Sequence, residues 1–185
     1  MKNKMQNEIK TSTKKDLEKF IQSSSFKKIF LLAGSTSYVE SGLKDFFSIF
    51  NKKNIKIFFK EKNIPEYEEL ITIANEINKF NPDLVIAAGG GSVLDYAKIA
   101  NVLYISNSLK NDISNSEYKL IKPNRKLLAI PTTAGSGAEV TANAVIYVNN
   151  VKYSIEGELI KPDIHFLVPD FVKGASNKIK SSAGS

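Results

Sequence analysis

Two segments rich in small residues contain groups that could bind a phosphorylated ligand. The first, Gly89-Gly90-Gly91-Ser92, follows an apolar stretch and precedes a helical pattern. Glycine at such a turn lets backbone N–H groups approach a ligand without interference from a Cβ atom. The free N–H groups and positive dipole end of the following helix suit a phosphate or pyrophosphate. Consecutive glycines and a serine exceed what a bare strand–helix turn needs, so we interpret this segment as a phosphate-binding turn.

The second segment runs from Pro131 to Gly137 and reads Pro-Thr-Thr-Ala-Gly-Ser-Gly. Its hydroxyl groups can donate hydrogen bonds to, and accept them from, a ribose or an amide. By itself a turn of this composition is usually only a loop. Because it follows another apolar stretch that is typical of a buried strand, we predict that it forms a second wall of the same site.

Asp95, Lys98 and His165 are the other residues whose chemistry bears on a site. Asp95 is either a first-turn acid favoured by the helix dipole, or a carboxylate that points away from a pyrophosphate toward a ribose or nicotinamide. Lys98 is either a solvated lysine or a ligand contact. His165, the only histidine, lies in an apolar stretch, which is typical of a structural residue. The spacing of histidine and carboxylates indicates no acid–base pair and no metal cluster, so no catalytic or metal-binding residue is assigned.

The composition indicates a globular protein with a sizeable core. The chain has 185 residues, is 42% hydrophobic and has no cysteine, which excludes disulfides and thiolate metal sites. No apolar run approaches the ~20 residues that span a bilayer, and the polar N-terminus does not resemble a secretory signal. We therefore expect a cytoplasmic protein with no membrane partner. The net charge is +7, but the lysines are scattered, so we expect no nucleic-acid partner.

Apolar strands alternate with amphipathic helices through the first two thirds of the chain, which predicts a parallel α/β sheet with flanking helices. The expected helices are 16–23, 38–50, 67–80 and 95–104, and the expected strands are 28–33, 55–59, 84–88 and 127–130. Residues 107–124 are polar and aperiodic, which indicates a loop. Further along, 144–148 and 151–155 predict a β-hairpin around Asn149-Asn150, and 159–168 predict one more strand. From Gly174 the chain has little apolar content and we expect it to be mobile.

The two small-residue segments resemble the iron-containing alcohol dehydrogenase family, in the dehydroquinate synthase-like superfamily. That family carries a Gly-Gly-Gly-Ser-x-x-Asp-x-Ala-Lys turn, which matches residues 89–98, and an Ile-Pro-Thr-Thr-Ala-Gly-Thr-Gly-Ser-Glu-Val-Thr segment, which closely matches residues 130–141. The resemblance covers roughly residues 26–172, in the order expected for a Rossmann-like fold.

The resemblance implies that NAD or NADP binds to this part of the chain. Gly90, Gly91 and Ser92 would hold the pyrophosphate, and Asp95 would face the nicotinamide. The remaining implied contacts are the cofactor-lining residues Thr132, Thr133 and Ser136, the ribose contact Lys152 and, on the adenosine side, Asn63.

One departure from the family pattern bears on the choice of cofactor. Family members often have an aspartate after the first strand that accepts a hydrogen bond from the adenine ribose, whereas Ser35 stands there in this chain. Without that carboxylate the repulsion of a 2′-phosphate disappears, so the choice between NAD and NADP stays open. Ala138 also replaces a common serine.

The family pattern implies three segments in this chain. Residues 1–15 would be a flexible N-terminus, 16–172 an NAD(P)-binding α/β domain, and 173–185 a tail that leads to a missing helical C-terminal domain. In the family that domain binds the catalytic divalent metal, iron or zinc, so we expect the metal only in the complete enzyme, which would be a homo-oligomer. The complete enzyme would transfer hydride between an alcohol or aldehyde and nicotinamide, and the fragment alone would be inactive.

Three other functions are alternatives, and the first two stay open. A sugar- or polyol-phosphate dehydrogenase or synthase of the same superfamily would share the cofactor turns. A truncated, non-catalytic nucleotide-binding module would bind cofactor without turnover. A basic nucleic-acid binder is the least favoured alternative and would show strongly salt-dependent DNA binding.

Overall fold

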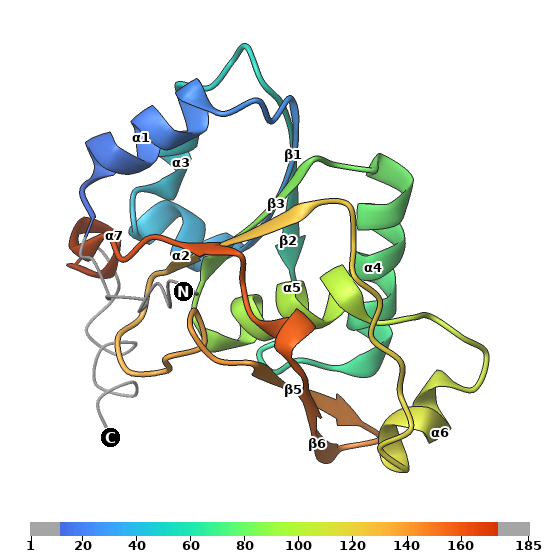
Figure 1. Cartoon of the computed structure of the whole chain (residues 1–185). Coiled ribbons are helices and arrows are strands. Elements are labelled where there is room, and N and C mark those ends of the chain that lie inside the picture. The colour runs from blue at the N-terminus through green and yellow to red at the C-terminus, as the bar shows by residue number, and fades with distance from the viewer. Residues whose placement is uncertain (1–11, 174–185) are drawn as a thin grey trace, which may run out of the picture.

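The centre of the molecule is a five-stranded sheet in which every pair of neighbours is parallel. The computed structural model describes residues 12–173. The strand order is β2-β1-β3-β4-β7, so the chain leaves β1 toward one edge and then returns to build toward the other (Figure 1). The strands are β1 (Lys28–Gly34), β2 (Asn54–Lys60), β3 (Leu84–Gly89), β4 (Lys126–Pro131) and β7 (Ile164–His165).

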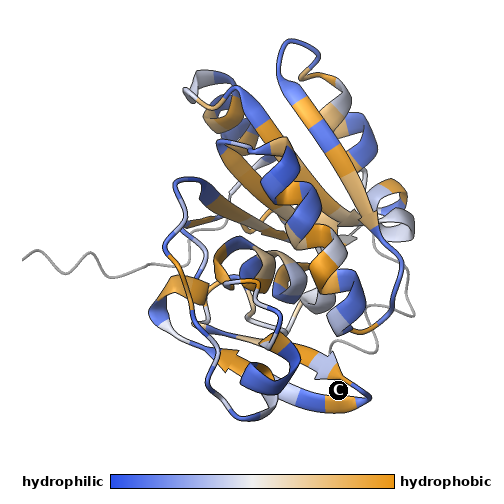
Figure 2. Cartoon of the chain, turned by 90° about the vertical axis from the view of Figure 1, so that its right-hand side faces the viewer, coloured by the Kyte–Doolittle hydropathy of each residue, from blue (hydrophilic) through white to orange (hydrophobic). Residues whose placement is uncertain are grey.

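Helices cover both faces of the sheet, and alternate residues of each strand supply the two cores. Phe30, Leu32, Val85 and Ala87 pack on one side, with the residues of α4 (Tyr67–Phe80) and α5 (Gly91–Val102). The residues between them in the strands pack on the other side, with α1 (Lys14–Ser23), α2 (Ser35–Glu40), α3 (Leu43–Ser48) and α7 (Pro169–Lys173). Burial on both faces explains why the central strands β1, β3 and β4 are mostly apolar, whereas the edge strand β2 is only partly buried and carries two lysines. Figure 2 shows this largely apolar sheet between helices with hydrophilic outer sides.

Aspartates fix the register at the amino ends of the strands. Asp83 accepts hydrogen bonds from the backbone N–H groups of Lys27 and Lys28 at 2.8 and 2.9 Å. Asp163 accepts one from the N–H of Leu127 at 2.9 Å. Each carboxylate thus joins the start of its own strand to the neighbouring strand, and the two hydrogen bonds from the β1 side hold the pKa of Asp83 below its usual range.

The predicted α/β class with a hairpin is confirmed, and the helix at 67–80 coincides with α4. The hairpin consists of β5 (Asn143–Val148) and β6 (Val151–Glu156). Its turn residues Asn149 and Asn150 have φ values of 50° and 65°, the left-handed pair that a two-residue hairpin loop requires.

Other boundaries were wrong. The single helix expected over 38–50 is two short helices, α2 and α3, because Gly42 adopts a left-handed φ of 80° between them. The helix expected over 95–104 is α5, which begins four residues earlier, within the glycine turn, and ends at Val102. α1 begins at Lys14, two residues before the expected start.

The loop expected over 107–124 contains the short helix α6 (Leu109–Ser114). The strand expected over 159–168 is instead a 3-10 helix, η1 (Glu158–Ile160), followed by the two-residue strand β7. The short helix α7 was not predicted at all. The tail from Gly174 lies outside the described residues, and no helix within residues 12–173 has the length and apolarity needed to cross a membrane.

We expect Gly89→Ala to destabilise the fold. A Cβ on Gly89 would lie 2.6 Å from Cγ2 and 2.8 Å from Cβ of Val93, so the β3–α5 turn would have to open. Such overpacking lowers the free energy of unfolding by about 1–3 kcal/mol, which urea denaturation measures. Gly90→Ala is the control, because its Cβ would meet nothing closer than 3.4 Å. Equal losses for both variants would contradict this account of the turn.

Candidate functional site

A cavity of about 340 Å³ lies at the carboxyl ends of the first four strands. We call it the crevice. It is lined by residues at or just after the ends of β1 (Gly34, Ser35, Thr36, Ser37), β2 (Lys60, Glu61, Asn63), β3 (Gly90, Ser92, Val93) and β4 (Thr132, Thr133). The chain reverses direction across the sheet between β1 and β3, and ligands bind at such reversal points in open α/β sheets.

The glycine turn leaves room for a ligand at the start of α5. Gly90 is the N-cap, and no side chain caps the helix, so the first N–H groups of α5 lack intrahelical partners. Cβ atoms built on Gly90 and Gly91 would come no nearer than 3.4 Å to Thr133 and 3.6 Å to Ser136. Gly89 is therefore the glycine required by packing, while Gly90 and Gly91 keep the backbone accessible to a phosphate.

Thr132 provides an unpaired hydroxyl. Its side chain is fully buried, and its Oγ1 has no hydrogen-bond partner within residues 12–173. Its backbone N–H donates to the carbonyl of Gly89 at 2.9 Å, which joins the ends of β3 and β4. A buried hydroxyl without a partner destabilises a fold, and Thr132 is among the residues that line the crevice, so its hydroxyl is a candidate hydrogen-bonding group for a ligand there.

Tyr96 holds the wall that carries Asn63. Its side chain is fully buried, and its hydroxyl accepts from the N–H of Glu66 at 2.7 Å and donates to the carbonyl of Ile64 at 3.2 Å. Burial raises the pKa of this phenol, which therefore stays protonated. Tyr96 was not singled out from the sequence, because a tyrosine in an apolar helix carries no sign of a distant loop partner.

Lys98 is neither solvated nor free for a ligand, which corrects both interpretations of this residue. It is 1% exposed, and its Nζ donates to the carbonyls of Ala138 and Asn143 and to the hydroxyl of Thr141. Burial lowers the pKa of this amine, and nearby Asp95 partly offsets the shift. Lys98 thus ties α5 to the segment between β4 and β5.

Asp95 and Lys152 lie outside the residues that line the crevice. Burial raises the pKa of Asp95 to about 6, opposed by Lys98, a backbone hydrogen bond from Val145 and Lys152. Asp95 and Lys152 therefore lie near each other, on the side of α5 that faces the hairpin.

The sequence-predicted residues are thus arranged in three groups. Gly90, Ser92, Asn63, Thr132 and Thr133 line the crevice. Gly91 and Ser136 adjoin each other at its glycine turn. Asp95 and Lys152 form the third group.

Four polar lining residues were not singled out from the sequence: Thr36, Ser37, Lys60 and Glu61. The rule that ligands bind at the carboxyl ends of parallel strands could have found them, because they lie at or just after the ends of β1 and β2. Burial lowers the pKa of the Lys60 amine, partly offset by Glu69, and its Nζ donates to the carbonyl of Lys62.

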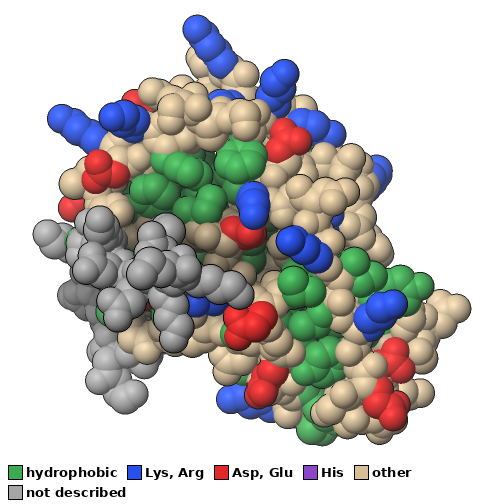
Figure 3. Space-filling model, viewed as in Figure 1, with side chains coloured by type: hydrophobic (Ala, Val, Ile, Leu, Met, Phe, Trp, Pro, Cys, Tyr) green, Lys and Arg blue, Asp and Glu red, His purple; other side chains and the backbone are tan. Residues whose placement is uncertain are grey.

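The described residues do not fit a metal site. No group of three or more histidine, cysteine, aspartate or glutamate side chains within residues 12–173 could hold an ion. His165 lies in β7, opposite Ala129 of β4. On the face shown in Figure 3, Lys and Arg side chains are dispersed, with Asp and Glu side chains among them.

Residues 9–169 match the family model for iron-containing alcohol dehydrogenases. The chain is 35% identical to the alcohol dehydrogenase of Thermococcus barophilus over 126 residues, and this match covers 65% of the present chain and 33% of that protein. It is 32% identical over 170 residues to the 4-hydroxybutyrate dehydrogenase of Clostridium kluyveri, with coverages of 88% and 45%.

A solved structure has the same fold. The sulfoacetaldehyde reductase of Bifidobacterium kashiwanohense, determined in complex with NAD+, has a TM-score of 0.80 at 21% identity, and the match covers 95% of this chain and 47% of that one. The present chain therefore spans less than half the length of these relatives.

We expect Asp95→Asn to stabilise the protein above pH 6 and to have little effect near pH 4 and below. The folded-state pKa of about 6 exceeds the ordinary aspartate pKa of 3.8. Below pH 3.8 Asp95 is protonated in both the folded and the unfolded state. The free energy of unfolding falls as pH rises from about 4 to about 6, and it stays at the lower value above pH 6. A pKa difference of about two corresponds to a loss of up to about 3 kcal/mol in the free energy of unfolding. Urea denaturation at pH 4 and pH 8 measures it, and a variant less stable than wild type at pH 8 would contradict the sign.

Proposed function

The chain belongs to the iron-containing alcohol dehydrogenase family, and on that premise we propose that residues 16–172 form the domain that binds NAD or NADP for such a dehydrogenase. The observation that carries the proposal is the buried, unpaired Thr132 hydroxyl in a crevice bordered by the glycine turn. A cavity of about 340 Å³ is within the range of small-molecule sites and accommodates part of a dinucleotide.

In this proposal the protein binds and orients the cofactor. The N–H groups at the start of α5 and the hydroxyl of Ser92 hold the pyrophosphate, and Thr132 supplies a hydrogen bond inside the crevice. The other predicted contacts are Gly90, Gly91, Thr133, Ser136, Asn63, Asp95 and Lys152. The bound nicotinamide supplies the hydride-transfer chemistry.

Asp95 and Lys152 would contact a cofactor only where it extends beyond the crevice toward the hairpin. The raised pKa of Asp95 follows from burial. Near neutral pH a larger fraction of this carboxyl is therefore protonated than of an exposed aspartate. We propose that it accepts a hydrogen bond from the nicotinamide end of the cofactor.

The whole protein's substrate would be a small alcohol or aldehyde, and a divalent metal, iron or zinc, would be bound by residues outside 12–173. The described residues supply no metal-ligand group. We therefore propose that this chain alone binds cofactor without turnover, which titration with NADH and NADPH combined with an alcohol-oxidation assay tests. Absence of saturable binding of either cofactor to the folded chain would refute the proposal.

Thr132→Val should change stability and cofactor binding in opposite senses. Removing a buried hydroxyl that lacks a partner raises the free energy of unfolding by about 1 kcal/mol. The same change removes a hydrogen bond to the cofactor and raises its Kd about tenfold. Urea denaturation and NADH fluorescence titration measure the two effects. Thr72→Val, on the exposed side of α4, is the control, and a stabilised variant with unchanged Kd would contradict the role of Thr132.

Ser35→Asp should select against NADPH. Ser35 is exposed at the start of α2 and lines the crevice, with Lys60 also in the lining. An added carboxylate would repel a 2′-phosphate of charge about −2, and at a few ångström the repulsion exceeds a factor of ten in Kd. We expect the Kd ratio of NADPH to NADH to rise at least tenfold. Ser25→Asp, at the opposite end of the sheet, adds the same charge and should leave the ratio unchanged. An unchanged ratio for Ser35→Asp would mean that the adenine ribose binds elsewhere.

A further inference from the structure

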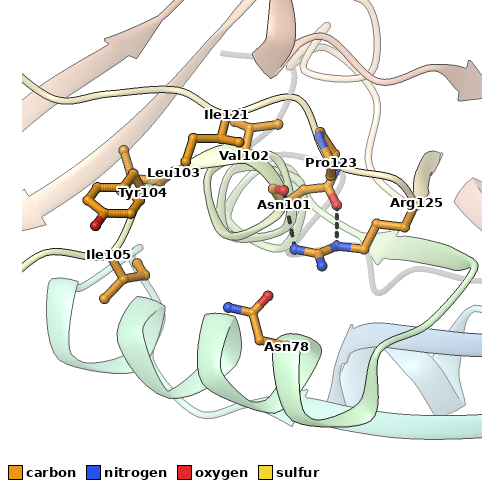
Figure 4. Close-up of a pocket in the computed structure, with 9 residues that line it drawn as sticks. All are labelled: Asn78, Asn101, Val102, Leu103, Tyr104, Ile105, Ile121, Pro123 and Arg125. Atoms are coloured by element: carbon orange, nitrogen blue, oxygen red, sulfur yellow. Dashed lines mark hydrogen bonds between the residues drawn. The ribbon is translucent and has the colours of Figure 1, made fainter.

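A second hollow, of about 320 Å³, lies away from the crevice, beside the amino end of β4 (Figure 4). The last turn of α4, the last turn of α5 and the segment that leads into β4 surround it. Because α5 begins at the crevice and ends here, the two sites lie at opposite ends of that helix. None of the twelve crevice-lining residues lines the second hollow.

Arg125 brings a positive charge to this hollow without a countercharge. Its Nε donates to Oδ1 of Asn101 at 2.9 Å, and its Nη2 donates to the Asn101 carbonyl at 3.3 Å. Both acceptors are neutral, and Nη1 has no partner in the described part of the chain. Burial lowers the pKa of the guanidinium, and no carboxylate contributes an opposing shift. A partly desolvated guanidinium favours an anion as its missing partner.

Asn78 lies across the hollow from Arg125. Figure 4 shows its amide rising from α4 on the side of the guanidinium turned away from Asn101. The side chain is exposed and makes no hydrogen bond within residues 12–173. Figure 4 draws the amide oxygen of Asn78 nearer to the guanidinium, and a half-turn of this unbonded amide brings its N–H to that side. The amide N–H and a guanidinium N–H can then together donate to the two oxygens of a carboxylate.

The rest of the lining is apolar, which distinguishes this hollow from a simple anion site. Tyr104 and Ile121 are 51% and 43% exposed, although large apolar side chains are usually buried. With Leu103 and Ile105 they would cover a hydrocarbon group that extends from the carboxylate.

We propose that this hollow binds a small monocarboxylate with a short apolar body, the carboxylate bonded to Arg125 and Asn78 and the body against Tyr104 and Ile121. A phosphate would satisfy the guanidinium but would leave the apolar lining in water. A neutral apolar molecule would fill the lining and leave the guanidinium without an anion.

Benzoate is the probe, titrated into the 15N-labelled 185-residue chain and followed by heteronuclear NMR. We expect saturable shifts at the Asn78 side-chain amide and the Arg125 Nε–H, with a Kd in the millimolar range for a ligand of this size. Benzamide, the neutral isostere, and inorganic phosphate should each bind at least tenfold more weakly. Equal binding of benzamide would overturn the role of the charge, and equal binding of phosphate would overturn the role of the apolar lining.

Two matched pairs of variants test the location. Arg125→Met should weaken benzoate binding at least tenfold, whereas Lys122→Met, an exposed charge outside this hollow, should not. Since loss of Arg125 also removes its bonds to Asn101, a second pair leaves those bonds intact. Asn78→Trp fills the hollow from an exposed position, and Asn75→Trp, exposed on the same helix, does not line it. Undiminished binding by Asn78→Trp would overturn the assignment.

Discussion

The structure depends most on the contact between Gly89 and Val93, which brings the end of β3 directly against the first turn of α5. Because no Cβ intervenes, α5 starts immediately after the strand and its N–H groups face the crevice. The helix then passes through the core, with nine of its twelve residues buried. A helix that is buried this deeply has almost no polar face in water to fix its rotation about its axis. Its position must therefore be set by packing and by the hydrogen bonds of its polar side chains.

Three buried polar side chains of α5 each attach the helix to a different segment. Tyr96 bonds the residues before α4, Lys98 bonds the segment between β4 and β5, and Asn101 bonds Arg125 at the start of β4. Since an unpaired polar group in the core destabilises the fold, each of these segments is held where its partner is satisfied. One helix thereby positions walls of both the crevice and the second hollow.

Much of this fold is predictable from sequence because two-sided burial leaves a strong pattern. Apolar strands and the periodic helix α4 were located closely from residue types alone. The errors occur where a single residue or a contact between distant segments determines where a helix or strand begins and ends. Gly42 divides α2 from α3 through its backbone conformation, while α6 and β7 are too short to show periodicity and are held by tertiary packing.

In the candidate site, too, the features that depend on local sequence were predictable and those that depend on distant contacts were not. The carboxyl-end rule and the glycine turn identified residues that line the crevice, because both depend on local chain order. The burial of Lys98 was not predictable, since its acceptors lie more than forty positions away in the chain for two of its three bonds. The pairing of Arg125 with neutral Asn101 is equally invisible in sequence, where an arginine before a strand suggests a solvated charge.

Lys98 and Arg125 differ in how fully their N–H donors are bonded. Lys98 has three acceptors and needs no ligand. Arg125 donates only to neutral atoms of Asn101, and its Nη1 has no partner in the described part of the chain. The buried charge of Lys98 is therefore structural, whereas the half-buried charge of Arg125 is a reason to look for an anion.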